Sequence, residues 1–334
     1  MGLNVLVTGG AGYIGSHACK ALAAAGHHPV TFDSLVSGHP WAVKWGPLVE
    51  GDLADGELIR KTLREHEIQA VMHFAAFACV GESMQHPGKY FRNNVGNTIN
   101  LLDAMVDEGV GPMVFSSTCA TYGVPDSGLV AEDHPQCPVN PYGESKLFIE
   151  RALNWYGVAH GLRSVTLRYF NAAGADPDGE IGEDHDPETH LIPLVIQTAL
   201  GQRAEVQIFG TDYSTTDGSA VRDYIHVSDL AAAHVNAIDK LSQGAGSFAV
   251  NLGTGKGHSV KQVIAMVEQV SERKVNAKAC GRRAGDAPEL VARPGLAAAL
   301  LDWVPRYSEL ETIVTTALQW RASQCGIEER ALTA

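Results

Sequence analysis

The feature that most constrains the fold is a glycine array near the start of the chain. Gly9, Gly12 and Gly15 are spaced as GxxGxxG and follow the apolar run NVLVT, which predicts a strand. Helical spacing begins at Gly15 and continues to Ala25. An ordinary glycine turn carries the same residues, but a strand, a tight turn and a helix in this order favour a dinucleotide site. There the helix N-terminus faces a pyrophosphate.

Short apolar runs alternate with helical patterns through the first half of the chain. Further strands are predicted in the runs HPVTF, PLVEG, AVMHF, PMVFSS and SVTLRYF. Helices are predicted between them over residues 56–65, 89–108 and 142–160. This alternation is typical of a parallel sheet with helices on both faces.

After residue 174 the pattern loosens. Isolated strands are predicted over residues 206–209 and 275–279, and helices over residues 228–241, 260–272 and 308–322. We therefore expect an α/β fold, a Rossmann-type doubly wound parallel sheet with a smaller α/β C-terminal substrate domain. The expected dinucleotide-binding domain covers residues 1–173 plus about 223–254. The expected substrate domain covers about 174–222 plus 255–334.

The charge balance excludes several classes of partner. The 334 residues include 25 Lys and Arg against 38 Asp and Glu, a net charge of −13. We expect no nucleic-acid partner and no anionic membrane surface, because phosphate-rich partners need a basic face. No apolar run approaches the roughly 20 residues that span a bilayer.

The cysteines and histidines predict neither disulfides nor a metal site. The six cysteines are scattered without a CxxC pair, which favours free thiols in a cytoplasmic protein. The loop GEDHDPETH places His185 and His190 among acids, but its spacing matches no zinc pattern. A solvated loop is the expectation there.

An acid at the end of the second strand bears on the choice of dinucleotide. Asp33 stands 33 − 15 = 18 residues after Gly15. A carboxylate at this spacing accepts hydrogen bonds from ribose hydroxyls and repels a 2′-phosphate, which favours NAD over NADP. A loop-starting Asp is the alternative. Asp52, after the third strand, has the same two interpretations, with the adenine amino group as its candidate partner.

The segment PYGESK contains a tyrosine and a lysine that could carry out proton transfer. Tyr142 and Lys146 are four residues apart and share one face of the predicted helix. A free tyrosine titrates near ~10, so it is a poor base at pH 7, and a neighbouring ammonium favours the phenolate. A half-buried amphipathic helix face also gives this spacing, but the upstream glycine array favours the chemical interpretation.

Seven groups of residues occur together and in order along the chain. They are TGGAGYIGSH, HFAA with VGES, the pair Asn93–Asn94, SSTCATYG, PYGESK, RYFNAAG and VRDYIHVSDLA. Through them the chain, from Met1 to about Trp320, resembles the UDP-glucose 4-epimerase family of the extended short-chain dehydrogenase/reductase superfamily. The resemblance implies reversible C4 epimerisation of UDP-galactose and UDP-glucose through a 4-keto sugar. It also implies tightly bound NAD that takes and returns the hydride, and a homodimer.

The resemblance assigns roles to individual residues. It implies that Tyr142 removes the proton of the sugar 4-hydroxyl, that Lys146 tunes Tyr142 and bonds the nicotinamide ribose, and that the Thr118 hydroxyl bonds the 4-oxygen. Besides the three glycines, Tyr142 and Lys146, the implied NAD contacts are Tyr13, Ile14, Asp33, Ser34, Asp52, Leu53, Phe74, Ala75, Ala76, Asn94 and Phe170. The implied UDP-sugar contacts, besides Thr118 and Tyr142, are Asn171, His190, Leu191, Gln207, Phe209, Arg222, Arg283, Asp286 and Leu290.

Several departures from the family leave alternatives open. Ala78 stands where some members carry a Lys that reaches the cofactor phosphates. Leu290 stands where sugar-restricted members carry a bulkier Tyr, which leaves room for N-acetylated UDP-hexoses. A 4,6-dehydratase is disfavoured because Cys119 and Ala120 follow Thr118 where the elimination acids stand. An epimerase for UDP-pentoses or UDP-uronic acids, a dehydrogenase that releases NADH and a non-catalytic NAD-binding protein stay open.

Overall fold

A seven-stranded parallel sheet forms the core of the larger part of the molecule. The computed structural model describes residues 2–125, 128–283 and 285–327. The strand order is β3-β2-β1-β4-β5-β7-β11, with every neighbouring pair parallel. The strands are β1 (Asn4–Thr8), β2 (His28–Asp33), β3 (Leu48–Glu50), β4 (Ala70–His73), β5 (Pro112–Thr118), β7 (Arg163–Tyr169) and β11 (Phe248–Leu252). The predicted doubly wound fold is confirmed.

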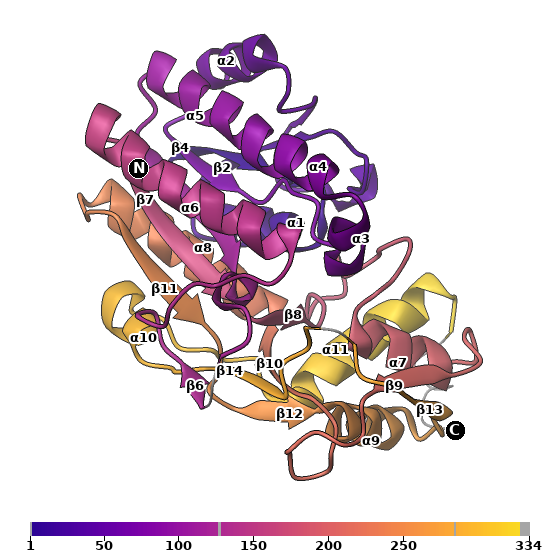
Figure 1. The fold of residues 1–334 in the computed structure, drawn as a ribbon. Coiled ribbons are helices and arrows are strands. Elements are labelled where there is room, and N and C mark those ends of the chain that lie inside the picture. Colours follow the sequence, from indigo (N-terminus) through magenta and orange to yellow (C-terminus); the bar gives the residue numbers. More distant parts are fainter. Residues whose placement is uncertain (1, 126–127, 284, 328–334) are drawn as a thin grey trace.

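Helices cover both faces of this sheet (Figure 1). Alternate residues of β1 point to opposite faces, because side chains in a strand have a period of two. Val5 and Val7 pack with α1 (Tyr13–Ala24), α8 (Val227–Ser242) and α10 (Leu296–Leu301). Leu6 packs on the other side with α2 (Gly56–Glu65), α5 (Asn97–Asp107) and α6 (Pro141–His160).

A smaller α/β assembly is built mainly from the C-terminal half of the chain. Its five-stranded sheet contains β6 (Leu129–Val130), β8 (Asn171–Ala173), β10 (Val221–His226), β12 (Gly257–Ser259) and β14 (Glu289–Ala292). A separate pair joins β9 (Val206–Phe209) and β13 (Ala277–Cys280). A third apolar core unites α7 (Leu191–Ala199), α9 (Val260–Ser271) and α11 (Leu310–Gln324). In Figure 1 this assembly lies below the larger sheet.

The segment predicted as one helix over residues 89–108 is interrupted, and that prediction was wrong in detail. The structure has α3 (Val80–Gln85), α4 (Pro87–Tyr90), a π-helical stretch at Phe91–Gly96 and then α5. The wider turn places the buried Asn94 side chain against the Phe77 backbone, accepting from its N–H at 2.9 Å and donating to its carbonyl at 3.0 Å. Such π-turns often accompany functional sites.

Other departures from the predicted elements are smaller. The strand predicted over residues 275–279 begins two residues later, as β13. The elements not predicted from the sequence are β10, β11, α3, α7, α10, the short strands of the five-stranded sheet and two short 3₁₀ helices, Pro40–Ala42 and Cys119–Tyr122. All six cysteines are free thiols. Among the described residues, no helix is both long and apolar enough to traverse a bilayer.

The turn after β1 depends on two glycines that approach other backbone atoms closely. Gly9 has φ +74°, and a Cβ built there lies 2.6 Å from the Ala75 nitrogen. A Cβ on Gly15 lies 2.2 Å from the Gly9 carbonyl oxygen. Neither neighbour is a flexible side chain, so only glycine lets α1 pack this closely on the loop.

Replacing Gly15 with alanine is expected to destabilise the fold. Alanine in a helix is ordinarily better than glycine by about 1 kcal/mol. The backbone clash reverses that sign, with an expected loss of about 1–3 kcal/mol in the free energy of unfolding. Gly81 of α3 is the matched control, because a Cβ there meets nothing within 4 Å. Urea unfolding should show Gly81→Ala unchanged or more stable; equal stability of Gly15→Ala and the parent protein would contradict the clash.

Candidate active site

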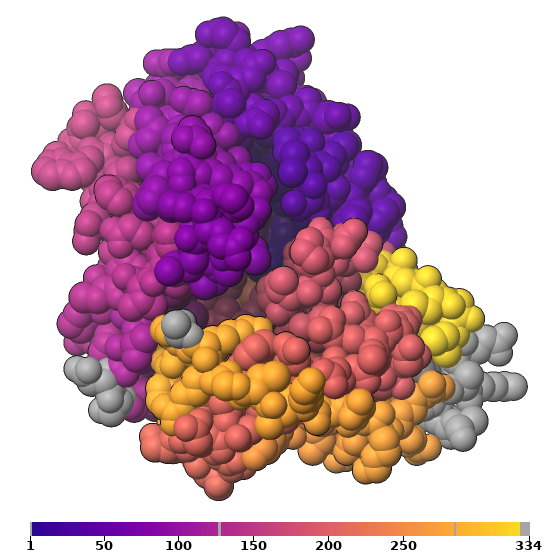
Figure 2. All heavy atoms as spheres, turned by 45° about the vertical axis from the view of Figure 1, so that its right-hand side comes forward, coloured from indigo at the N-terminus to yellow at the C-terminus, as the bar shows by residue number. Residues whose placement is uncertain are grey.

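A cavity of about 490 Å³ lies at the carboxyl ends of the sheet strands. Its walls come from β1, β2, β4, β5 and β7 and from the segments that follow them, on both sides of the point where strand order reverses between β1 and β4. Ligands of doubly wound sheets bind at this switch point. Figure 2 shows the molecule hollowed between its N-terminal part and the segments around α7.

Most of the residues predicted to contact NAD line this cavity. They are Gly9, Gly12, Tyr13, Ile14, Gly15, Asp33, Ser34, Asp52, Leu53, Phe74, Ala75, Ala76, Tyr142, Lys146 and Phe170. Asn94 is buried behind the wall, where it also donates to the Ser145 hydroxyl of α6 at 3.1 Å. From the predicted sugar-nucleotide set, Thr118, Asn171 and His190 line the cavity.

The loop after β1 is shaped to receive a phosphate group. Gly12 is the N-cap of α1 and offers no capping side chain, so the N–H groups of the first turn face the cavity without a side-chain partner. The dipole of α1 favours negative charge at the same end. The absence of Cβ atoms at Gly9 and Gly15 gives a cradle of bare backbone, which fits a dinucleotide pyrophosphate.

Asp33 supports this loop from the end of β2. Its carboxylate accepts from the backbone N–H of Ala11 at 3.0 Å and of Leu35 at 2.8 Å. The side chain also lines the cavity. Each carboxylate oxygen has two lone pairs, so these contacts leave capacity for ribose hydroxyls. The residues present therefore fit an NAD adenosine.

Tyr142, Thr118 and Lys146 meet at the other end of the cavity. Asn140 caps α6 by accepting from the Gly143 N–H at 2.8 Å, and Pro141 occupies the first helical position, which directs Tyr142 into the cavity. Thr118 ends β5, and its hydroxyl hydrogen-bonds the Tyr142 side chain. Lys146, one turn further along α6, donates to the Ser116 carbonyl at 2.8 Å.

Burial dominates the titration of this group. Desolvation raises the pKa of Tyr142 well above its ordinary value; Tyr169 adds to this, and the hydrogen bond with Thr118 opposes it. Desolvation lowers the pKa of Lys146 from 10.5 to about 7, against the attraction of Glu150. The expectation that the ammonium next to Tyr142 lowers the tyrosine pKa is therefore not met by these side chains. Burying the charge costs more than the neighbouring groups return, and residue spacing along a helix does not show that cost.

A buried ion pair fixes the far side of α6. Glu150 lies one turn beyond Lys146 and pairs with Arg168 of β7 at 2.7 Å. The Ser117 hydroxyl of β5 also donates to Glu150, at 2.5 Å. Because both ionic partners are over nine-tenths buried, their geometry is tightly constrained, and α6 is held against the two strands that flank the site.

The remaining predicted sugar-nucleotide residues lie outside the cavity walls and form contacts in the smaller assembly. Arg222 of β10 donates to Asp286 at 3.2 Å and to the Ala287 carbonyl at 2.9 Å. The Arg283 guanidinium lies 3.8 Å from the Phe209 ring centroid. Leu290 packs against the apolar group containing Cys119 and Phe170. Leu191 begins α7, and Gln207 is exposed on β9.

Several cavity residues are not among those predicted to contact NAD or the UDP-sugar. They are Phe32, Val36, Ser37, Gly38, Gly51, Phe77, Ala78, Val80, Asn93, Asn97, Cys119, Ala120, Tyr169, Ala172, Glu183 and His185. Asn97 shows the difficulty: it donates to Asp52 at 3.1 Å across 45 residues of sequence, and nothing local marks that contact. Glu183 and His185 carry a local signal, the GEDHDPETH loop, but its spacing predicts a solvated segment.

Known proteins that resemble this chain agree with a dinucleotide-binding active site. The NAD dependent epimerase/dehydratase family matches residues 5–253. This chain belongs to that family. Its members in the comparisons include the UDP-glucose 4-epimerase of Rhizobium meliloti (strain 1021), which is 52% identical over 319 residues, 96% of this chain and 97% of the relative.

Solved structures of the epimerase/dehydratase family superpose on nearly the whole chain. The UDP-glucose 4-epimerase from Brucella ovis, in complex with NAD, has a TM-score of 0.93 and 51% identity, covering 95% of this chain and 97% of that one. The enzyme from Bifidobacterium longum, in complex with NAD+ and UDP, has a TM-score of 0.91 and 35% identity, covering 97% and 100%. The cofactor of this family member is therefore NAD, in agreement with the sequence prediction.

Lys146 gives the stability of this epimerase/dehydratase family member a distinctive pH dependence. Its pKa is about 7 in the folded chain, against 10.5 ordinarily. Between these values the unfolded chain keeps a proton that the folded chain has released. The contribution of Lys146 to stability therefore rises with pH, by at most about 1.4 kcal/mol per pH unit. Below the folded-state pKa both states hold the proton, and this dependence vanishes.

The test compares urea unfolding of the parent protein and Lys146→Met across pH. The parent-minus-variant difference in the free energy of unfolding is expected to rise between about pH 7 and 9 and to stay flat below about pH 6. Parallel stability curves over that whole range would show that Lys146 keeps an ordinary pKa.

Proposed function

We infer that this chain is an isomerase that interconverts UDP-galactose and UDP-glucose at C4, using NAD. One observation carries the inference: Tyr142, Thr118 and Lys146 meet in the same cavity as the glycine cradle. The chain is also 52% identical to a UDP-glucose 4-epimerase over nearly its whole length. A non-catalytic NAD-binding protein has no need to keep a hydroxyl, a phenol and a lysine together at this position.

We propose that the cavity holds NAD along its length. The first turn of α1 and the glycine cradle bind the pyrophosphate, and Asp33 accepts from the adenosine ribose. Lys146 reaches the nicotinamide ribose, and Phe74 with Phe170 supply apolar wall. When bound, NAD supplies a hydride acceptor and donor for sugar C4, together with a positive ring charge that favours the Tyr142 phenolate.

The chain's own residues then move the proton. The Tyr142 oxygen accepts the proton of the sugar 4-hydroxyl and returns it to the other epimer. The Thr118 hydroxyl, already bonded to Tyr142, holds the sugar 4-oxygen beside it. Burial makes the free phenolate costly, so Tyr142 becomes an effective base only beside positive charge. Tyr142 would accept the proton as the phenolate, hold it as the neutral phenol while the sugar is a 4-keto intermediate, and then return it to the 4-oxygen.

We propose that the nucleotide sugar spans the cleft toward the smaller assembly. This rests on the family resemblance and on two local groups, Arg222 with Asp286 and Arg283 with Phe209. Guanidinium groups bind phosphates in a bidentate fashion. Asn171, His190, Leu191 and Gln207 complete the proposed set. The proposed domain division, residues 1–173 plus about 223–254 for NAD and the rest for UDP-sugar, rests on the resemblance. The structure departs from it where β6, β8 and β10 join the smaller sheet and α10 packs on the larger one.

The range of sugars depends on few residues. Leu290 packs with Cys119 and Phe170 next to the Tyr142 end of the cavity. A leucine there occupies less volume than tyrosine, and we propose that N-acetylated UDP-hexoses are also accepted. UDP-pentoses and UDP-uronic acids are the second candidate class. The free cysteines fit a reducing compartment, and we propose that the enzyme acts in the cytoplasm.

Purified protein is expected to convert UDP-galactose to UDP-glucose without added cofactor. Tyr142→Phe should retain NAD but lose roughly 10²–10⁴-fold in turnover, because the proton acceptor is gone. Tyr156→Phe is the matched control, since its hydroxyl lies on the same helix and bonds Asp103 away from the cavity. A nearly normal rate for Tyr142→Phe would assign the base elsewhere, and no conversion by the parent protein would reject the epimerase. Refusal of UDP-N-acetylgalactosamine would discard the open sugar pocket.

We propose that the functional unit is a homodimer that pairs through α6. Phe148, Trp155 and Val158 lie at helical spacing i, i+7 and i+10, and their exposed fractions are 45%, 71% and 78%. Phe91 extends this apolar stripe by packing edge-on against Phe148, with ring centroids 6.1 Å apart. An exposed apolar face that extends over two neighbouring helical segments, here α6 and Phe91–Gly96, is typical of an interface between two copies of a chain.

Analytical ultracentrifugation is expected to find a dimer. Trp155→Glu should raise its dissociation constant by at least about 10-fold, because a charge would replace an aromatic side chain that the dimer interface would bury. Val304→Glu is the control, since Val304 is similarly exposed, at 67%, but lies outside the stripe. A monomeric parent protein, or equal weakening by both variants, would reject α6 as the interface.

A further inference from the structure

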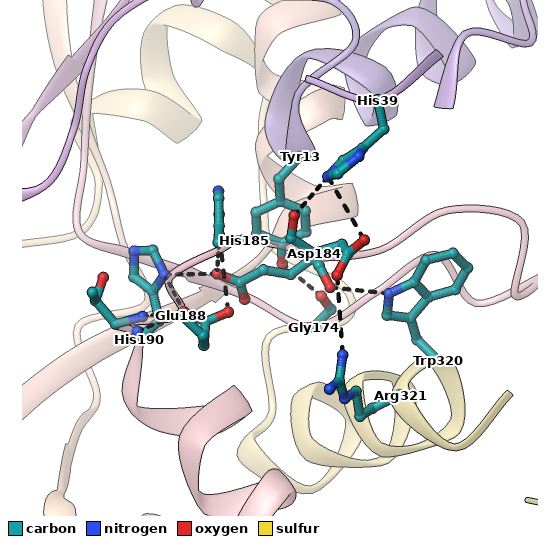
Figure 3. A network of polar contacts seen from close by, with 11 residues as sticks. Tyr13, His39, Gly174, Asp184, His185, Glu188, His190, Trp320 and Arg321 are labelled. Carbon is teal, nitrogen blue, oxygen red and sulfur yellow. Dashed lines mark hydrogen bonds and ion pairs between the residues drawn. The ribbon is translucent and has the colours of Figure 1, made fainter. Parts of the chain in front are cut away.

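The loop between β8 and α7 brings four metal-ligating side chains to one point. Glu183, His185, Glu188 and His190 lie within eight residues of sequence, and one ligand atom of each lies within 4.8 Å of the others. Figure 3 shows His185, Glu188 and His190 turned toward one another. From this convergence we propose that the four side chains bind a divalent transition-metal ion, with Zn²⁺ as the best fit.

The distances match a tetrahedral ion. Bonds of about 2.0–2.1 Å to zinc place neighbouring ligand atoms about 3.3 Å apart. The Glu183 Oε1 lies 3.0 Å from the His185 Nδ1 and 2.8 Å from the His190 Nδ1. Glu188 lies 3.0 Å from the His190 Nδ1 and 3.9 Å from the His185 Nδ1. These four separations bracket the value that zinc requires, so small side-chain adjustments suffice.

Backbone N–H groups of Thr189 and His190 donate to Glu188, but the imidazole protons serve only part of the remaining contacts. Each imidazole Nδ1 carries at most one proton, which points in one direction, yet each Nδ1 here faces two carboxylates. The Glu183 and Glu188 side chains are only 7% and 8% exposed. Buried carboxylates need a paired charge or a metal. One divalent cation at the centre neutralises both and uses all four ligand atoms together.

The surroundings hold the ligands in place. Trp320 of α11 donates to the Glu183 carbonyl at 3.1 Å, and the Tyr13 ring packs edge-on against His185. His39 bonds the carbonyl of the neighbouring Asp184 at 2.8 Å. Three distant segments therefore fix the loop, and such support from outside the ligand set orients metal ligands. Mixed imidazole and carboxylate ligands suit zinc better than Mg²⁺ or Ca²⁺, which prefer oxygen alone.

A second acidic group in the same loop provides a contrast. Asp176, Asp178 and Glu180 also converge, but the Lys20 ammonium already lies 2.7 Å from all three carboxylates. That group has its cation within the chain. The Glu183–His190 group contains no lysine or arginine among its four members. Among the described residues, its carboxylates form ion pairs only with the two imidazoles of the group, and a divalent cation would replace those pairs.

Zinc binding is measured on the full-length protein, stripped with a chelator and then titrated with ZnCl₂ in a calorimeter. A single tightly bound ion per chain is expected. Glu183→Gln and His185→Gln should each weaken it by at least about 10-fold. His160→Gln, at the exposed end of α6, and Asp178→Asn are the matched controls and should leave it unchanged. Zinc and protons compete for the two Nδ1 atoms, so affinity should fall as pH falls.

The results of this titration distinguish zinc bound by these four side chains from zinc bound elsewhere on the protein. Equal loss in the controls, or unchanged affinity in Glu183→Gln and His185→Gln, would place any bound zinc on other histidines and overturn the proposal. No saturable binding by the parent protein would show that the four side chains form an ion-pair network only. Should the two ligand variants fail to fold, the Co²⁺ spectrum of the parent protein decides: intense visible bands indicate the tetrahedral site, and a weak octahedral spectrum overturns it.

Discussion

The close approach of bare backbone after β1 is the constraint on which the site depends. The Gly9 carbonyl oxygen lies only 2.2 Å from where a Cβ of Gly15 would be. The Ala75 nitrogen, in the segment after β4, lies 2.6 Å from where a Cβ of Gly9 would be. This contact brings the N-terminus of α1 onto the carboxyl edge of the sheet, between β1 and β4. Because strand order reverses there, the adjacent loops diverge and leave the cavity open.

Charge burial governs the opposite end of that cavity. Tyr142 and Lys146 are held in an apolar wall, with Phe115 5.0 Å from the Lys146 nitrogen, and burial pushes both toward their neutral forms. The chain compensates for buried charge elsewhere, in the Arg168–Glu150 pair beneath α6. The Arg168–Glu150 support and the uncharged pair Tyr142 and Lys146 can coexist because Tyr142, Lys146 and Glu150 lie on consecutive turns of α6. The support fixes geometry, while the reacting groups stay responsive to the charge of a ligand.

Residue periodicity and glycine geometry predicted the structure correctly wherever the contacts join residues close in sequence. The strand at Asn4–Thr8, the helix that presents Tyr142 and Lys146, and the glycine turn all follow from periodicity and glycine geometry within about twenty residues. They failed at Phe91–Gly96, where the π-helical turn is set by a contact between Asn94 and Phe77, on a different segment. Asp229 is similar: it lies in the first turn of α8, but its carboxylate accepts from the Arg306 and Tyr307 N–H groups, more than 75 residues further along the chain.

By itself the sequence determined the parallel α/β class, the dinucleotide turn and the tyrosine–lysine face, because each is written in residues a few positions apart. The tertiary structure alone decided how distant segments meet. Leu129–Val130 pairs with Val291–Ala292, and Trp320 closes over the Glu183 loop. The tertiary structure also brings four side chains of GEDHDPETH, a loop whose spacing predicts a solvated segment, together at one point. Side-chain direction in a loop depends on what packs against it, and here that packing comes from residues more than 130 positions away.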